Sequence, residues 1–162
     1  MQKQRNMTSI FLCSHGKILL LYRQGSKVVN NVCIGAAGGH FEEGELNNAQ
    51  ACVLRELKEE LSIDEDMLSD LKLRYITMGC ASGEIRINYF FFANLENGQE
   101  MQLKSDEGIL KWFLHEEIKD LEMSFAAQYV LEHYLAIGQF NQMLYGGIAE
   151  GKKMVFTQMP EF

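Results

Sequence analysis

The sequence contains only one proline, Pro160, and no apolar run that approaches the roughly 20 residues needed to span a bilayer. Its first residues, MQKQRNMTS, also lack the apolar segment of a signal peptide. These absences predict a cytoplasmic protein without a membrane segment. With 47% hydrophobic and 23% charged residues, the composition is that of a globular protein and excludes a chain that is mainly disordered.

Basic residues are in short supply, since 15 Lys and Arg face 22 Asp and Glu and give a formal net charge of −7. A protein that binds nucleic acid through its phosphates normally carries the opposite imbalance. A polynucleotide partner is therefore disfavoured, whereas a small nucleotide substrate is not.

The sequence also lacks any C-x-x-C pair, and its cysteines lie far apart. Neither a zinc site nor a small disulfide framework is therefore predicted. We expect reduced thiols, mostly buried, at Cys13, Cys33, Cys52 and Cys80.

A length of 162 residues fits one compact domain, because single domains commonly run to roughly 100–200 residues. Short apolar or alternating segments between turn residues predict strands. They form an opening hairpin (10–13 and 17–22), a long hairpin (70–79 and 85–95), a strand (109–114) and a terminal hairpin (144–148 and 154–156).

Loops are expected over residues 24–33 and over the acidic residues 42–45, which lead into the first helix. A second helix is expected within residues 115–137, with one apolar face made by Ala126, Val130, Tyr134 and Ile137. The order of elements predicts an α+β fold with a mixed sheet and a few helices. We interpret residues 1–162 as a single domain in which residues 138–162 are a C-terminal extension.

The clearest helix begins at Asn47 or Asn48, either of which can serve as the N-cap, and runs to about Leu61. Its apolar residues recur every four positions, as on one face of an α-helix. They are Ala49, Val53, Leu57 and Leu61.

Three glutamates on this helix, Glu56, Glu59 and Glu60, are spaced at i, i+3 and i+4 and so share one face. Like charges at this spacing repel, which favours a cation between them. Ligands that are all oxygen select a hard ion such as Mg²⁺ or Mn²⁺. The alternative interpretation of the same three residues is a solvated acidic helix face.

The residues around these glutamates form a longer pattern. The sequence reads Gly38-Gly39-His40-Phe41-Glu42-Glu43-Gly44-Glu45, then nine residues, then Arg55-Glu56-Leu57-Lys58-Glu59-Glu60-Leu61-Ser62-Ile63. It resembles the signature of the Nudix hydrolases, G-x5-E-x7-R-E-U-x-E-E-x-G-U, in which U is a bulky aliphatic residue.

The sequence departs from this signature at two points. Nine residues instead of seven separate Glu45 from Arg55, so that Asn47 occupies the nominal spacing. Ser62 stands where the signature has glycine. Because glycine accepts a left-handed conformation at a helix end, serine there either costs up to about 1 kcal/mol or makes the helix end differently.

The resemblance covers most of residues 8–137. It implies an α/β/α sandwich around a mixed sheet. It also implies that Glu56, Glu59 and Glu60 bind one to three Mg²⁺ ions together with the carbonyl of Gly38 or Gly39, while Arg55 holds Glu56 by an ion pair. A further carboxylate must deprotonate or orient the attacking water, and Glu60 and Glu107 are the candidates; the alternative for Glu107 is a surface loop acid.

Other residues are candidates for contact with the substrate. Arg23 and Arg86 follow or lie on strand segments, and a guanidinium can bind phosphate, although solvated surface arginines fit equally well. Gly39 and His40 lie in the Gly-Gly turn. Aromatic side chains that either stack a base or belong to the core are Tyr89, Phe90, Phe125 and Tyr129.

The resemblance implies a Mg²⁺-dependent hydrolase that cuts a pyrophosphate bond in a nucleoside diphosphate linked to a group X. A nucleoside triphosphate, oxidised or not, cleaved to monophosphate and pyrophosphate is favoured; ADP-ribose and dinucleoside polyphosphates are alternatives. A non-catalytic module that senses a nucleotide sugar is another alternative, as is a prenyl diphosphate isomerase with Cys33 or Cys80 as nucleophile. The terminal hairpin is expected either to cover the pocket or to form a homodimer contact.

Overall fold

The computed structural model describes residues 2–23 and 32–161. Most of the predicted loop over residues 24–33 lies outside them, and its last two residues, Val32 and Cys33, begin a strand instead. The strands are β1 (Lys3–Ser14), β2 (Lys17–Arg23), β3 (Val32–Gly35), β4 (Ser69–Ala81), β5 (Glu84–Asn94), β6 (Ile109–Leu114), β7 (Tyr145–Glu150) and β8 (Lys153–Gln158). The helices are α1 (Ala49–Leu61), α2 (His115–Ile118) and α3 (Phe125–Ala136), with short 3-10 turns η1 (Glu43–Glu45), η2 (Glu65–Met67) and η3 (Gly138–Phe140).

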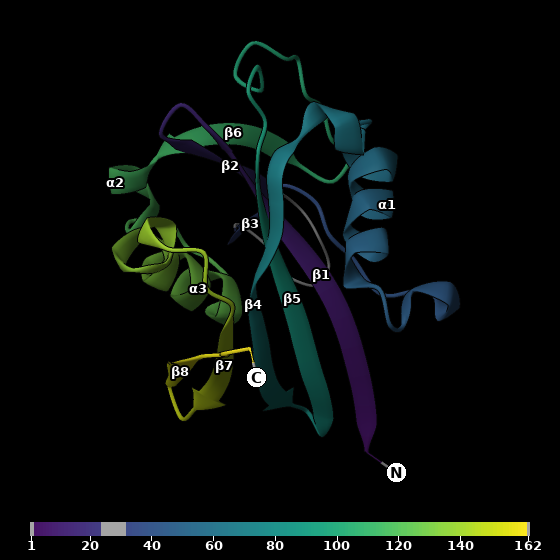
Figure 1. The fold of residues 1–162 in the computed structure, drawn as a ribbon, viewed down its shortest axis with the longest axis vertical. Coiled ribbons are helices and arrows are strands. Elements are labelled where there is room, and N and C mark those ends of the chain that lie inside the picture. The colour runs from purple at the N-terminus through teal and green to yellow at the C-terminus, as the bar shows by residue number, and fades with distance from the viewer. Residues whose placement is uncertain (1, 24–31, 162) are drawn as a thin grey trace.

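All strands of the described residues join one mixed sheet in the order β3-β2-β1-β5-β4-β7-β8, with β6 paired to β2 (Figure 1). The opening hairpin is antiparallel, as predicted, and the long hairpin pairs β4 with β5. β1 also runs parallel to β5, with Met7 beside Asn88. No described helix is long and apolar enough to cross a bilayer.

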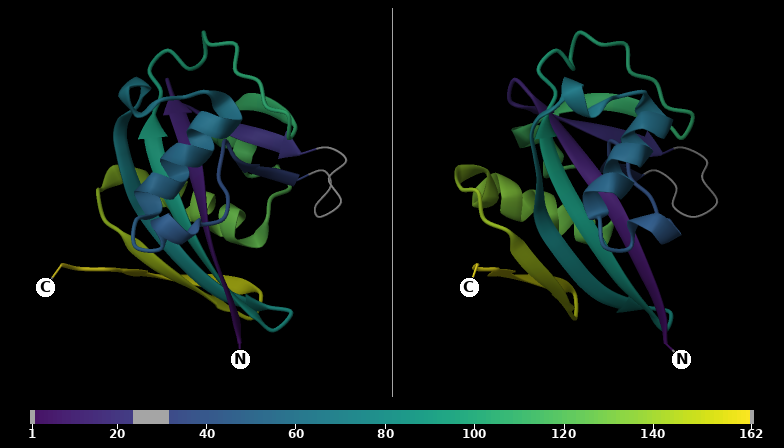
Figure 2. Two further views of the ribbon diagram at one scale, coloured as in Figure 1. Left: turned by 90° about the vertical axis from the view of Figure 1, so that its right-hand side faces the viewer. Right: turned by 45° about the vertical axis from the view of Figure 1, so that its right-hand side comes forward.

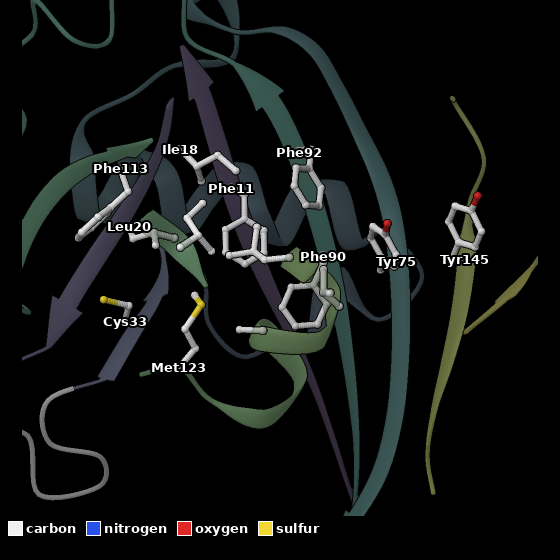
Figure 3. Close-up of a cluster of buried hydrophobic side chains, with 14 residues drawn as sticks. Phe11, Ile18, Leu20, Cys33, Tyr75, Phe90, Phe92, Phe113, Met123 and Tyr145 are labelled. Carbon is white, nitrogen blue, oxygen red and sulfur yellow. The ribbon is translucent and has the colours of Figure 1, made fainter. Parts of the chain in front are cut away.

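The sheet lies between α1 on one face and α2 with α3 on the other, so the predicted α/β/α arrangement is confirmed (Figures 1 and 2). Successive side chains of a strand point to opposite faces. On β1, Ile10 and Leu12 therefore pack in the cluster with α1, whereas Phe11 packs with α3. Figure 3 shows the cluster on the α3 side, in which Phe11, Phe90 and Phe92 are in ring contact.

The predicted face of α3 is confirmed in part, because Val130 is buried and Ala126 and Tyr134 pack against the same core cluster. The helix also buries Ala127 and Leu131, while Ile137 is 48% exposed beyond the helix end. Most residues of this helix are apolar, so its periodicity locates the buried face only approximately. Contact with the sheet decides which face is buried.

The terminal segment forms the predicted hairpin, with its turn at Gly151 and Lys152. It does not lie apart from the fold, because β7 pairs in parallel with β4 and places Tyr145 beside Tyr75. Their rings stack with centroids 5.5 Å apart. The strands β7 and β8 of the predicted extension therefore belong to the main sheet.

Arg74 on β4 is a buried cation that sequence analysis missed. Its guanidinium donates hydrogen bonds to the main-chain carbonyls of Gly138, Asn141 and Met143, at 2.8 to 3.0 Å. The segment that connects α3 to β7 is thereby held against β4. Arg74 lies two positions after Lys72, so strand alternation predicts both side chains on one solvent-facing side, with no signal that distant carbonyls surround Arg74.

Helix α1 ends at Ser62, which adopts a left-handed conformation with φ of 56°. Its N–H donates to the carbonyls of Leu57 and Lys58, as the glycine of the signature would. The substitution of serine has therefore kept the helix end and strained the backbone. Replacement Ser62→Gly should stabilise the protein by about 0.5–1 kcal/mol and raise the Tm by about 1–4 °C.

The measurement is thermal unfolding at neutral pH. Ser124→Gly is the matched control, because Ser124 is equally exposed but has a φ of −61° and gains nothing from glycine. An unchanged or lowered Tm for Ser62→Gly would contradict the strain argument.

Candidate active site

The predicted site residues meet beside the N-terminal half of β1, where α1 and the Gly-Gly turn both approach the sheet. The turn runs along β1, and the Thr8 N–H donates to the Gly39 carbonyl at 2.8 Å. Gly38 has a φ of +153° and lies so close to β1 that a Cβ would come within 2.2 Å of the Thr8 carbonyl oxygen. Only glycine fits this position.

Gly39 is required for a different reason. A Cβ on this residue would come within 2.2 Å of Glu56 Oε1, so the missing side chain leaves room for the carboxylate. The turn and the helix therefore enclose a space with a carboxylate on one side and main chain on the other.

This space is part of a cleft of about 490 Å³. Of the residues predicted to bind metal or to act in catalysis, all except Glu59 line it, as do Arg23 and His40, and it adds Met7, Phe41 and Glu42, which sequence analysis did not single out. The lining residues are Met7, Arg23, Gly38, Gly39, His40, Phe41, Glu42, Arg55, Glu56, Glu60 and Glu107.

Arg55 is the centre of the hydrogen-bonding network in this cleft. Its Nη1 donates to Glu56 Oε1 at 3.0 Å, which is the predicted ion pair, and to Glu59 Oε2 at 3.1 Å. Its Nε and Nη2 hold both oxygens of Glu45, at 2.7 and 3.0 Å, in a bidentate pair. Nη2 also reaches the carbonyl of His40 at 3.1 Å.

The position of Glu45 corrects the expectation of an exposed acidic loop. Residues Glu43–Glu45 form a 3-10 turn, and Glu45 is buried with 8% exposure. The Arg55 hydrogen bonds lower the pKa of Glu45 to about 2. Despite the two extra residues before Arg55, Glu45 thus stays in contact with Arg55. The 3-10 turn holds the Glu45 carboxylate in place, because the Glu42 N–H donates a hydrogen bond to it.

Glu60 is a carboxyl group whose charged form is disfavoured by its surroundings in the cleft. Burial raises its pKa to about 7, and the negative charges of Glu107 and Glu56 add to the rise. The Gly38 N–H, 3.4 Å from Glu60 Oε2, offsets part of it. A group in this state favours a nearby proton or cation, which is a common property of functional sites.

The carboxylates of α1 do not converge on a single point. Within residues 2–23 and 32–161, no three His, Cys, Asp or Glu side chains lie close enough together to hold one metal ion. Glu59 is 58% exposed at its side chain and bonds to Arg55, whereas Glu56 and Glu60 face the cleft. Arg55 supplies the positive charge that separates Glu56 from Glu59.

Arg23 and Glu107 form an ion pair at the rim of the cleft. They come together because β2 and β6 pair with Tyr22 opposite Ile109, which places the end of one strand beside the turn before the other. This pairing over 84 positions could not be read from the sequence.

The remaining candidates lie outside the cleft or at its rim. His40 is exposed and contributes its carbonyl to Arg55. Arg86 bonds to Glu84, Phe90 is in the core, and Phe125 with Tyr129 lies on α3. Tyr89 packs on Phe41 with ring centroids 5.1 Å apart, and so supports the cleft wall from behind.

No cysteine lines the cleft in the described part of the chain. Cys33 is buried in the α3-side core, and Cys80 is exposed near Gln2. The arrangement therefore offers no support for a cysteine nucleophile. All four cysteines are free, with Cys33 and Cys52 buried and Cys13 partly buried.

Comparison with known proteins places this geometry in a family. A family model described as NUDIX domain matches residues 3–134. No curated protein matches the chain in sequence.

Solved structures share its fold at low identity. The mutator MutT protein from Bacillus halodurans is 20% identical, with 97% of this chain and 99% of that one covered and a TM-score of 0.67. A NUDIX hydrolase from Nitrosomonas europaea is 16% identical over 92% and 80% of the two chains, with a TM-score of 0.71. An Ap4A hydrolase from C. elegans is 16% identical over 85% and 99%, with a TM-score of 0.67.

The Glu45–Arg55 pair predicts a stability change with a defined pH dependence. Because the folded pKa of Glu45, about 2, lies below its ordinary value of 4.5, the pair stabilises the fold above pH 4.5 and loses that contribution as pH falls toward 2. Glu45→Gln should lower the free energy of unfolding by about 2–3 kcal/mol at pH 7. In urea titrations the deficit should shrink by more than half at pH 3. Glu43→Gln, in the same turn but exposed, should change little; a deficit independent of pH would contradict the assignment.

The raised pKa of Glu60 predicts a pH dependence of stability opposite in sign to that of Glu45. The folded pKa of Glu60, about 7, lies above 4.5, so the metal-free fold loses stability as pH rises from 4.5 through 7. In EDTA at pH 8, the free energy of unfolding of Glu60→Gln, from urea titrations, should therefore exceed that of the wild type by about 2 kcal/mol. Most of this gain should be gone at pH 5. Glu59→Gln, which removes an exposed carboxylate, should show no such gain. Equal stability of Glu60→Gln and wild type at pH 8 would contradict the raised pKa.

Proposed function

Because the chain belongs to the NUDIX domain family, we propose that it is a hydrolase that uses a divalent metal to cut a pyrophosphate bond in a nucleoside diphosphate linked to a second group. The observation that carries this proposal is the cleft in which Glu56 and Glu60 face the Gly-Gly turn. Glu60 is held there with a raised pKa, and the absence of a side chain on Gly39 leaves room for the Glu56 carboxylate against the turn.

These residues fit a hard divalent cation, because their donors are all oxygen. Glu56 and Glu60 would hold it with a carbonyl of the Gly-Gly turn, and Glu59 would join them. The Gly39 carbonyl already accepts the Thr8 N–H, which favours Gly38 for this contact. When bound, Mg²⁺ or Mn²⁺ neutralises phosphate charge and lowers the pKa of bound water.

The protein's own groups would position the reaction. Arg55 holds Glu56 from one side and is itself fixed by Glu45 from the other, so the carboxylate does not rotate freely. Glu60 or Glu107 would orient and deprotonate the attacking water, because both carboxylates line the cleft. Arg23, Gly39 and His40, which line the same cleft, would contact the diphosphate.

A nucleoside triphosphate is the substrate that we favour, with ADP-ribose and dinucleoside polyphosphates as alternatives. The small size of the protein, 162 residues, favours this substrate, and solved structures of similar fold include a mutator MutT protein and an Ap4A hydrolase. We also expect that a second copy of the chain can bind at the terminal hairpin to form a homodimer.

The test is release of phosphate or pyrophosphate from nucleoside triphosphates, ADP-ribose and dinucleoside polyphosphates, with about 5 mM Mg²⁺ or Mn²⁺ and with EDTA. One class should turn over, require metal, and lose about 10²–10³-fold in kcat in Glu60→Gln and Glu59→Gln. Glu132→Gln, an exposed acid on α3, is the control that should keep full activity. Binding of a nucleotide or nucleotide sugar without any turnover would replace the hydrolase by a sensing module.

A further inference from the structure

The ion pair of Arg23 with Glu107 closes one end of the cleft and is built into the backbone. β2 ends at Arg23, and Tyr22 pairs with Ile109 of β6. Between them Gly108 lies so close to β2 that a Cβ would come within 2.3 Å of the Tyr22 carbonyl oxygen. The missing side chain at Gly108 lets the turn before β6 bring Glu107 against Arg23.

Arg23 is the one guanidinium of the described cleft that is free to exchange its partner. The other, Arg55, bonds to Glu45, Glu56, Glu59 and the His40 carbonyl, and these contacts join the turn to the helix. Arg23 instead has a partly exposed partner, since the Glu107 side chain is 45% exposed. Exposed ion pairs are weak, so such a pair can be displaced by a better anion.

A phosphate group is a better anion for this position. Guanidinium binds phosphate in a bidentate manner, and a diphosphate carries more charge than a carboxylate. The same cleft also holds Glu56 and Glu60, which repel an anionic substrate, while the guanidinium of Arg55 is already bonded to Glu45, Glu56 and Glu59. The carboxylate of Glu107 occupies the place that the proposed substrate needs.

We propose that Glu107 competes internally for the phosphate-binding position at Arg23, so that a phosphate group of the substrate binds there only by releasing Glu107. This inference rests on the proposed function for the identity of the ligand. Arg23 is then the residue that contacts phosphate, and Glu107 is released on the side of the cleft that holds Glu60. The exchange links the binding of phosphate to the availability of a second carboxylate in the reaction zone.

The experiment measures binding of inorganic pyrophosphate to the full chain in EDTA, by calorimetry or ³¹P NMR, so that neither metal nor hydrolysis contributes. Glu107→Gln should bind pyrophosphate about 3–10-fold more tightly than the wild type, because Arg23 is no longer occupied by a carboxylate. Asp106→Asn is the matched control: it removes the same charge from the neighbouring residue and should change the affinity less than twofold.

The second half of the test is a double-mutant cycle with Arg23→Gln. This variant should weaken binding, and adding Glu107→Gln to it should restore nothing beyond the effect of Asp106→Asn. Binding that stays below detection in the double variant agrees with the exchange. Circular dichroism and the Tm of each variant confirm that the fold is kept.

Three results would overturn the exchange. They are an equal gain in Glu107→Gln and Asp106→Asn, a gain that persists without Arg23, and no pyrophosphate binding in either the wild type or Glu107→Gln. A wild type that hydrolyses nucleotides but shows one of these results disproves the exchange alone. A chain that hydrolyses nothing disproves the proposed function, while the binding comparison can still be read.

Discussion

The guanidinium of Arg55 holds together the two parts of the chain from which the cleft is made. Helix α1 supplies the carboxylates, and the segment before it supplies the Gly-Gly turn and Glu45. These parts share no strand pairing with each other, and the side-chain hydrogen bonds of Arg55 join them directly. Arg55 bonds to both of them, and its bidentate contact with buried Glu45 makes the arrangement directional rather than a general attraction of charges. Repulsion among the glutamates would otherwise turn their side chains outward.

The sheet provides the second constraint, because it carries both walls of the cleft on rigid strands. β1 anchors the Gly-Gly turn through main-chain hydrogen bonds, while α1 packs its apolar face on the same strand through Val53 and Leu57. The opposite rim comes from the register of β2 with β6. A functional constellation held by strands and a helix is more precise than one held by loops. Its weakest elements are therefore the exposed side chains Glu59 and Glu107.

The local elements of the fold could be predicted from the sequence, and the long-range ones could not. The four-residue recurrence of Val53, Leu57 and Leu61 was enough for α1, and turn residues marked both large hairpins. On α3 the prediction was right for Val130 and its neighbours Ala126 and Tyr134 but wrong for Ile137, because the helix ends before that residue. The burial of Glu45, by contrast, has a signal in hindsight, since an acid in the signature is expected to find Arg55 even across a longer loop. The Arg23–Glu107 pair and the β4–β7 pairing depend on registers between segments about 70 or more positions apart, which no local pattern encodes.

The buried guanidinium of Arg74 has a consequence for how this protein can vary. Its three carbonyl partners belong to the main chain of the segment between α3 and β7, so the contact depends on the path of that segment and hardly on its side chains. Within this segment Asn141 and Gly138 are constrained, because the Asn141 side chain also accepts from Arg74 and a Cβ on Gly138 would come within 2.3 Å of the Tyr75 hydroxyl; its other residues can vary and keep the contact, provided that its length is preserved. Arg74 itself has no such freedom, because a shorter or uncharged side chain leaves several acceptors without a donor. An insertion here would cost more than a substitution, which is the reverse of what holds for most surface connections.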